Sequence, residues 1–469
     1  MKLLSRFFDV SGDDGKKIER NERNKLYKDC INIAWPSAVE GLLMSIISSV
    51  DTMMVGTLGV ASISAVGLTA QPRLILLIIV QALCSGTTAL CARRKGADDR
   101  EAANACLMQS LLICTILGII ITLVGVFGAP WLMGLSGANE DTMDLSVAYF
   151  RIVASGFMFN CWNLCICAAM RAIGKTRITL VTNMTANLVN VCFNYLLING
   201  NFGFPALGVR GAAIATVIGN GVATVIAICA VAKKNGYYHF ALPKFDRVTI
   251  SGIYTVGSST ILENVSLRIG MLINSRLVAD CGTEVFAAYQ IASQVSSMSF
   301  NLGDGISNAG TSLVGQSLGA KRRDLARAHV TVARKISIVT SFALMLIMFL
   351  LRRQLALLFT DDAGVIAAAT AALIVIIVGM MPQNGRVVYS GCLRGAGDTR
   401  FVAICALVSV SILRPILTYI FSYPVARLFP GMYFEAMGPW IGFVIDALVR
   451  QYLLSRRIKT GKWMDVKIS

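Results

Sequence analysis

Charged residues are scarce in this 469-residue chain: they make up 15% of it, whereas hydrophobic residues make up 55%. A typical soluble domain is about one quarter charged, so the composition excludes an ordinary soluble fold. The net charge is +17, but the basic residues fall in short clusters between apolar runs of the roughly 20 residues that a membrane-spanning helix needs. This distribution is typical of a polytopic helical membrane protein. It argues against a nucleic-acid partner, and the unbroken apolar runs exclude a β-barrel, whose strands alternate.

Histidine is nearly absent, and with it the usual ligands of a catalytic metal. His239 and His329 are the only two in the sequence, and no CxxC pair occurs among the 13 cysteines, so no zinc or haem site is visible. Most cysteines lie inside apolar runs, where we expect them as small core residues. The sequence also lacks HExxH, GxSxG and Walker-type motifs. We therefore expect no enzyme, no cofactor and no metal other than Na⁺ as a coupling ion.

The apolar runs predict twelve membrane-spanning helices after a polar, charged segment, residues 1–30, that does not resemble a signal peptide and is expected in the cytoplasm. The predicted helices cover residues 31–57, 62–91, 104–128, 141–170, 178–199, 208–233, 248–279, 284–316, 329–351, 363–392, 401–422 and 437–456. Several exceed about 20 residues, so we expect them to tilt or to extend into the headgroup region. The predicted fold class is an all-α polytopic membrane protein.

Lysine and arginine are concentrated in every second connection between the predicted helices. The basic clusters lie at residues 93–100, 171–177, 233–247, 321–327 and 394–400. The alternate connections are poor in these residues, with Arg352 and Arg353 as a local exception. The positive-inside rule then places both termini in the cytoplasm and the chain in the cell (inner) membrane as a multi-pass protein. We expect the basic stripe to face lipid headgroups.

The two halves of the sequence repeat each other at one constant spacing. The turn RAIGKTR begins at Arg171, and the turn RGAGDTR begins at Arg394. The number of residues between these two turns equals the number between Gly59 and Gly282. The Gly-Ala pairs at 96–97 and 319–320 carry the same offset. A shared offset predicts a parallel repeat of two six-helix lobes inserted the same way up. The predicted lobes cover residues 31–233 and 248–456, with a cytoplasmic linker at 234–247 and a basic tail at 457–469.

Several motifs, taken in order, resemble the multidrug and toxic compound extrusion (MATE) transporters, and within them the NorM-like bacterial members. The motifs are WPSAVEGLLMSIISSVDTMMVG with Pro36 and Asp51, the RAIGKTR and RGAGDTR turns, VGQSLGA, and NLVNVCFNYLLI followed by GVRGAAIATVIGN. They extend over essentially the whole chain after residue 30. The resemblance implies twelve helices in two pseudo-symmetric lobes around a central cleft that opens alternately to each side. It also implies export of bulky organic cations, driven by inward movement of Na⁺ or H⁺.

Asp51 needs an explanation, because an ionisable residue inside a membrane helix costs at least ~2.5 kcal/mol. Asn190 and Asn194 lie four residues apart, hence on one helix face, where their carbonyl oxygens can ligate a hard cation. The resemblance implies that Asp51, Asn190, Asn194 and Thr216 converge as a cation-binding and coupling site. Some relatives have an aspartate in place of Asn194, which leaves Na⁺ and H⁺ both open. Two other interpretations stand: Asp51 as a helix-end residue near water, and the asparagines as packing between helices.

Glu263 in the seventh predicted helix is the corresponding candidate in the second half. NorM-like relatives have a glutamate there that resembles a cation or substrate anchor and is paired with an aspartate, which this chain replaces by Gln383. We expect Arg386, one turn further along the same helix, to neutralise Glu263 in a structural ion pair. A cation or substrate site formed by these three residues is the other interpretation. The remaining charges at membrane depth are expected to form pairs within a lobe or interfacial anchors; they are Glu40, Arg73, Arg268, Asp304, Arg414 and Asp446.

These observations favour a secondary active antiporter that exports amphipathic organic cations in exchange for Na⁺ or H⁺. Its expected partners are small organic cations and the lipid bilayer, and we expect a monomer. One alternative is a flippase for lipid-linked oligosaccharide or peptidoglycan precursors from the same superfamily, although no strongly cationic cavity or additional C-terminal helix is evident. An integral-membrane enzyme is the other alternative, and the lack of HExxH, GxSxG and Walker-type motifs argues against it.

Overall fold

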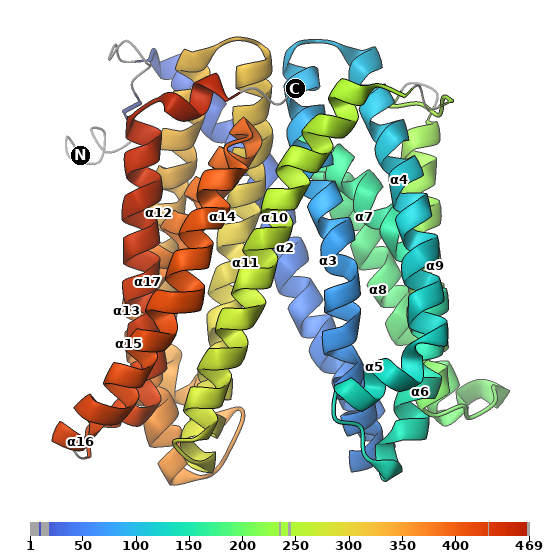
Figure 1. Ribbon diagram of the computed structural model, residues 1–469, viewed down its shortest axis with the longest axis vertical. Coiled ribbons are helices and arrows are strands. Elements are labelled where there is room, and N and C mark those ends of the chain that lie inside the picture. The colour runs from blue at the N-terminus through green and yellow to red at the C-terminus, as the bar shows by residue number, and fades with distance from the viewer. Residues whose placement is uncertain (1–8, 11–17, 234–235, 243–244, 430, 467–469) are drawn as a thin grey trace. The chain divides into compact units, whose positions relative to one another are not determined.

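The computed structural model describes residues 9–10, 18–233, 236–242, 245–429 and 431–466, and it is built from long helices joined by short turns (Figure 1). Among these residues no strand occurs. The first helices are α2 (Arg20–Gly56), α3 (Val60–Gly96), α4 (Arg100–Phe127), α5 (Ala129–Leu135), α6 (Glu140–Ser155), α7 (Phe157–Ala172), α8 (Thr176–Asn199) and α9 (Val209–Ala232). The later helices are α10 (Arg247–Ala279), α11 (Thr283–Gly319), α12 (Arg323–Leu357), α13 (Ala363–Ala396) and α17 (Phe434–Lys459). The predicted all-α fold is confirmed.

Each of the twelve predicted spans coincides with helix in the described chain, but two of them differ in detail. The first helix begins at Arg20, within the segment predicted to precede the membrane. The fourth span is a pair, α6 and α7, bent by 49° at Gly156. A Cβ atom at Gly156 would lie 2.9 Å from Val217 Cγ2 on α9. The missing side chain at Gly156 therefore leaves room for α9 to pack against the bend. Hydropathy alone does not reveal this contact.

The eleventh predicted span is interrupted by two turns of π-helix. It consists of α14 (Thr399–Val408), η2 (Ser409–Leu413), α15 (Arg414–Ile420), η3 (Phe421–Val425) and α16 (Ala426–Leu428). A π-helical turn holds one more residue than an α-helical turn and is often found at functional sites. The sequence offset between the two halves is therefore expected to grow by one after residue 413.

Contacts divide the chain into two compact units. The N-terminal unit is Val39–Gly257, and the C-terminal unit combines Ser258–Ile468 with the chain up to Ala38. The boundaries thus fall inside α2 and α10 rather than in loops. The predicted lobes, 31–233 and 248–456, follow the loops and stay a prediction. Residues 1–8, 11–17, 234–235, 243–244 and 467–469 of the predicted terminal segments and linker lie outside the described residues.

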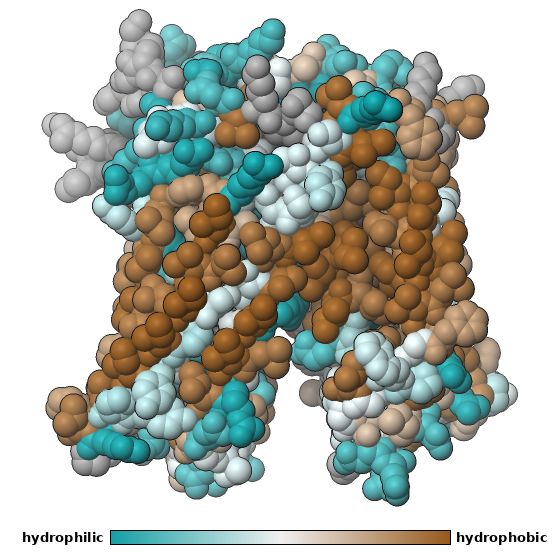
Figure 2. Space-filling view, viewed as in Figure 1, coloured by the Kyte–Doolittle hydropathy of each residue, from teal (hydrophilic) through white to brown (hydrophobic). Residues whose placement is uncertain are grey.

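Hydrophobic side chains cover the middle of the visible helices, and hydrophilic side chains gather at both of their ends (Figure 2). Seven described helices are long and apolar enough to cross a membrane, and eight if the bent α6–α7 pair forms one span. The large exposed side chains include Ile116, Ile119 and Leu123 on α4 and Phe342 and Leu346 on α12. In a bilayer such side chains face lipid, so their exposure is expected here.

Small residues allow α13 and α11 to pack with their backbones in contact. A Cβ atom at Gly391 would lie 2.6 Å from the carbonyl oxygen of Ser307, and one at Gly395 would lie 2.2 Å from that of Thr311. The Thr311 hydroxyl also donates a hydrogen bond to the carbonyl of Gly391 at 2.9 Å. Glycines spaced by four residues provide this close approach in membrane helices, where the hydrophobic effect does not drive helices together.

We expect Gly391→Ala to lower the melting temperature of the purified protein, because the new Cβ meets backbone that cannot move aside. Overpacking of this kind costs about 1–3 kcal/mol. A thiol-reactive fluorophore that reports exposure of the buried cysteines would measure the transition. Gly221→Ala is the matched control, since no atom lies within 4 Å of the added Cβ and alanine favours a helix. Equal melting temperatures for the two variants would contradict the packing described for α13.

Candidate functional site

The N-terminal unit joins the four residues of the predicted cation site in one chain of hydrogen bonds. The Asn194 amide nitrogen donates to Asp51 Oδ1 at 2.9 Å and to Asn190 Oδ1 at 3.2 Å. The Asn190 amide nitrogen donates to the Thr216 hydroxyl at 3.2 Å, and that hydroxyl donates to the carbonyl of Ala212 at 3.0 Å. The residues come from α2, α8 and α9, so the predicted convergence of Asp51, Asn190, Asn194 and Thr216 occurs in the structure.

The surroundings of Asp51 are largely shielded from solvent. Asn194 is 2% exposed and Asn190 is 6% exposed, while Asp51 itself is partly exposed. Arg73 of α3 lies within electrostatic range of Asp51, and Tyr149 of α6 contacts Thr216. One carboxylate with amide and hydroxyl oxygens nearby offers ligands to a hard monovalent cation or a proton acceptor. Among the described residues no group of three or more His, Cys, Asp or Glu is placed to hold a metal.

The second predicted set is arranged differently from the prediction. Glu263 of α10 pairs with Arg394, whose terminal nitrogen lies 2.7 Å from Glu263 Oε1. Arg386 instead donates through Nε to Gln383 Oε1 at 2.7 Å. The prediction that Arg386 neutralises Glu263 is therefore wrong, because Arg394 lies two turns further along α13 and reaches the carboxylate first. A structural ion pair at Glu263 is present, but its partner is a residue that the charge pattern had assigned to a connection.

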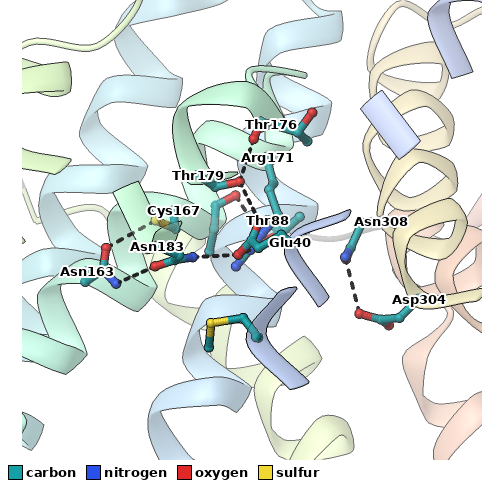
Figure 3. Close-up of polar contacts among 12 residues, drawn as sticks. Glu40, Thr88, Asn163, Cys167, Arg171, Thr176, Thr179, Asn183, Asp304 and Asn308 are labelled. Atoms are coloured by element: carbon teal, nitrogen blue, oxygen red, sulfur yellow. Dashed lines mark hydrogen bonds and ion pairs between the residues drawn. The ribbon is translucent and has the colours of Figure 1, made fainter. Parts of the chain in front are cut away.

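Glu40 is the centre of a polar network in the N-terminal unit (Figure 3). Its carboxylate accepts hydrogen bonds from the Thr179 hydroxyl at 3.1 Å and the Asn183 amide at 2.5 Å. Arg171 of α7 lies 3.6 Å from the same carboxylate. Asn163, also on α7, extends the network by donating to Asn183 Oδ1 at 3.1 Å. The charge of Glu40 is thus balanced within its own unit, as expected for a charge at membrane depth.

The two ion pairs are copies of one another. Glu263 follows Glu40, and Arg394 follows Arg171, at the constant offset of the repeat. The charge pattern alone does not predict this pair, because it assigns Arg171 and Arg394 to connections, whereas the structure places both inside helices. Applying the offset to every charged residue would have found it. The neighbouring threonines repeat as well, with Thr88 donating to the carbonyl of Ala168 at 3.3 Å and Thr311 to that of Gly391 at 2.9 Å.

Asp446 of α17 forms a further buried cluster in the C-terminal unit. Its carboxylate accepts hydrogen bonds from Arg414, from Arg450 at 2.6 Å and from the hydroxyl of Ser409. Asp446 is 0% exposed, and Arg414 and Arg450 are 6% and 4% exposed. Arg414 and Asp446 were expected to form pairs within a lobe or interfacial anchors, and the structure pairs them with each other inside the C-terminal unit.

Comparisons with known proteins agree with the motifs and the fold. The family model named MatE matches residues 36–196 and 259–420. A probable multidrug resistance protein NorM from Thermotoga maritima is 26% identical over 95% of this chain and 95% of its own length. A NorM of the same description from Idiomarina loihiensis is 28% identical over 94% of each. A solved outward-facing structure of a multidrug resistance MATE family transporter superposes with a TM-score of 0.85 at 23% identity, covering 93% of this chain and 97% of that one.

The solved structure, at 23% identity, supports the fold alone. The family model covers more than half of the chain in two segments, one in each half of the repeat. Each segment carries several of the motifs on which the resemblance rests, and the structure gives each of them the same glutamate–arginine ion pair. The chain therefore belongs to the MatE family, the MATE family of membrane transporters, and is a transporter rather than an enzyme.

Proposed function

We propose that the protein is a secondary active antiporter that exports amphipathic organic cations in exchange for Na⁺ or H⁺. The single observation that carries this proposal is the hydrogen-bonded chain from Asp51 through Asn194 and Asn190 to Thr216. It supplies one carboxylate at membrane depth that a small cation can neutralise. The names of the NorM relatives support the drug-like substrates. The proposed transporter acts as a monomer in the cell (inner) membrane.

Neutralisation of Asp51 would act on the packing of three helices. Asn194 donates to Asp51 and to Asn190 with the same amide nitrogen, so α2 and α8 are joined through a single side chain. A proton or Na⁺ on the carboxylate weakens its attraction for that donor and favours rotation of the amide, which presents an oxygen instead. The bound ion can bias the transporter only by its different affinity for the two access states.

The gradient of the coupling ion supplies the energy for this exchange. When one Na⁺ or H⁺ enters for each monovalent cation exported, no net charge crosses the membrane, so a one-to-one exchange depends on the ion concentration gradient alone. The membrane potential, about 2.3 kcal/mol per charge per 100 mV, adds energy when more positive charge enters than leaves in each cycle.

We propose from the loop charges that both termini lie in the cytoplasm. We expect cysteines introduced at Ala97 and Ala320, which are exposed in the turns after α3 and α11, to react with a membrane-impermeant maleimide only after the cells are opened. The two positions are equivalent in the repeat, so they serve as controls for each other. Labelling must be done in a background without the exposed Cys192 and Cys229. Labelling of either position in intact cells would overturn the proposed orientation.

The coupling role of Asp51 predicts the behaviour of Asp51→Asn in proteoliposomes. With a fluorescent organic cation as reporter, we expect this variant to lose transport driven by a Na⁺ or H⁺ gradient, because its neutral amide takes up no cation. Imposing the two gradients separately identifies the coupling ion. The melting temperature should stay close to that of the wild type, since an amide keeps the shape of the carboxylate.

Two variants control this experiment. Asp144→Asn on α6 removes an exposed carboxylate and should transport like the wild type. Glu263→Gln breaks the pair with Arg394 and is expected to weaken transport without abolishing the response to the gradient. Full coupled export by Asp51→Asn together with its loss in Glu263→Gln would move the coupling site to the C-terminal unit.

A further inference from the structure

The cluster around Asp446 has more donors than its carboxylate can satisfy. Asp446 Oδ2 accepts from both Arg414 and Arg450, and Oδ1 accepts from Ser409. The Nε atoms of Arg414 and Arg450 are nevertheless buried without a hydrogen-bond partner among the described residues. Both side chains are more than nine-tenths buried. A buried guanidinium donor without an acceptor is costly. The cluster therefore has room for a further hydrogen-bond acceptor, which the described residues do not supply.

Charge is also unbalanced around this cluster. Arg386 lies within electrostatic range of Asp446, Arg414 and Arg450, and its Nε donates a hydrogen bond to Gln383 Oε1. Glu263 also lies within electrostatic range of Arg386, but its carboxylate is already paired with Arg394. Including Asp304, which lies in the field of Arg394, the linked set holds four arginines and three carboxylates. The arginines of this set therefore outnumber its carboxylates by one.

The repeat shows that this charge is particular to the C-terminal half. Arg386 follows Asn163 at the offset of the repeat, and Arg414 follows Asn190 at that offset plus the one extra position that π-helical turn η2 inserts. Gly219 of α9 packs against Asn190, and Gly442 of α17, which follows Gly219 at the offset of the repeat, packs against Arg414. The N-terminal half thus has neutral residues at the positions where the C-terminal half has arginines.

A self-contained ion cluster is the alternative to a binding site. Buried Arg–carboxylate–Arg triads exist as purely structural elements, and such a triad carries one excess charge. Arg386 distinguishes the two cases, because it adds charge of the same sign, is only partly buried and is held by a neutral glutamine. An additional anion would relieve the repulsion that remains among the three arginines.

We propose that the arginine cluster of the C-terminal unit, Arg386, Arg414 and Arg450, binds a small anionic group. Its chemistry fits a monovalent anion, either free chloride or the carboxylate of a bound organic molecule. Guanidinium groups recognise such anions with charge-assisted hydrogen bonds. Arg386 is the accessible member of the cluster, and the buried pair supplies the positive field. This inference concerns binding alone and does not depend on which ion drives transport.

Anion binding can be measured on the purified full-length protein without any gradient. Sodium methanesulfonate, whose anion carries no carboxylate, is replaced stepwise by sodium chloride at constant Na⁺ and ionic strength, and the melting temperature is recorded. We expect the wild type to gain stability in proportion to the logarithm of the chloride concentration once the site fills. Arg386→Gln should lower the apparent chloride affinity at least about tenfold. Arg353→Gln removes an exposed arginine and should keep the wild-type response.

A second arm distinguishes free chloride from an organic carboxylate. An aromatic amine that carries a carboxylate and its methyl ester are compared as competitors of radioactive chloride bound to the wild-type protein. Competition by the acid alone supports a carboxylate subsite, and competition by neither compound supports an inorganic anion site. Absence of any chloride-dependent stabilisation or bound chloride in the wild type overturns the proposal. An unchanged chloride response in Arg386→Gln also overturns it, and Arg386→Lys replaces that variant if glutamine prevents folding.

Discussion

Pairing of the buried carboxylates within each bundle is the constraint on which the rest of this structure depends. Lipid offers no water to a charged side chain, so each buried carboxylate needs donors from its own helices. Glu40 and Glu263 meet this requirement in the same way, each with an arginine from the end of α7 or α13. These pairs join helices that are distant in the sequence. They fix the register in which the other polar residues of each unit meet.

Hydropathy and the internal repeat were sufficient to predict the fold. The twelve apolar runs and the single offset between the halves follow from the sequence because both depend on residue type and spacing alone. The grouping of Asp51 with Asn190, Asn194 and Thr216 came from the family resemblance. The structure supplies the reason: Asn194 bonds Asp51 and Asn190 at once, and four-residue spacing on α8 makes this possible.

Other features depend on tertiary contacts and were not predictable in this way. The sequence around an arginine at the end of an apolar run is the same whether its side chain reaches water or folds back onto a carboxylate. The charge pattern therefore assigns Arg394 to a connection. The break at Gly156 depends on how closely Val217 approaches. The π-helical turns after Val408 leave no mark on hydropathy. In each case the deciding partner belongs to another helix.

The unit boundaries inside α2 and α10 have a consequence for how the two halves are built. The start of α2 packs in the C-terminal unit, where a Cβ atom at Gly305 would lie 2.6 Å from Ala38 N, and the start of α10 packs in the N-terminal unit, where one at Gly86 would lie 2.8 Å from the carbonyl oxygen of Ile253. Each half of the repeat thus lends a helix end to the other, in the manner of a reciprocal domain exchange. Either half made alone would lack a segment of its own core. Because both halves belong to one chain, the start of α2 and the start of α10 are each present at high effective concentration for the unit into which they pack.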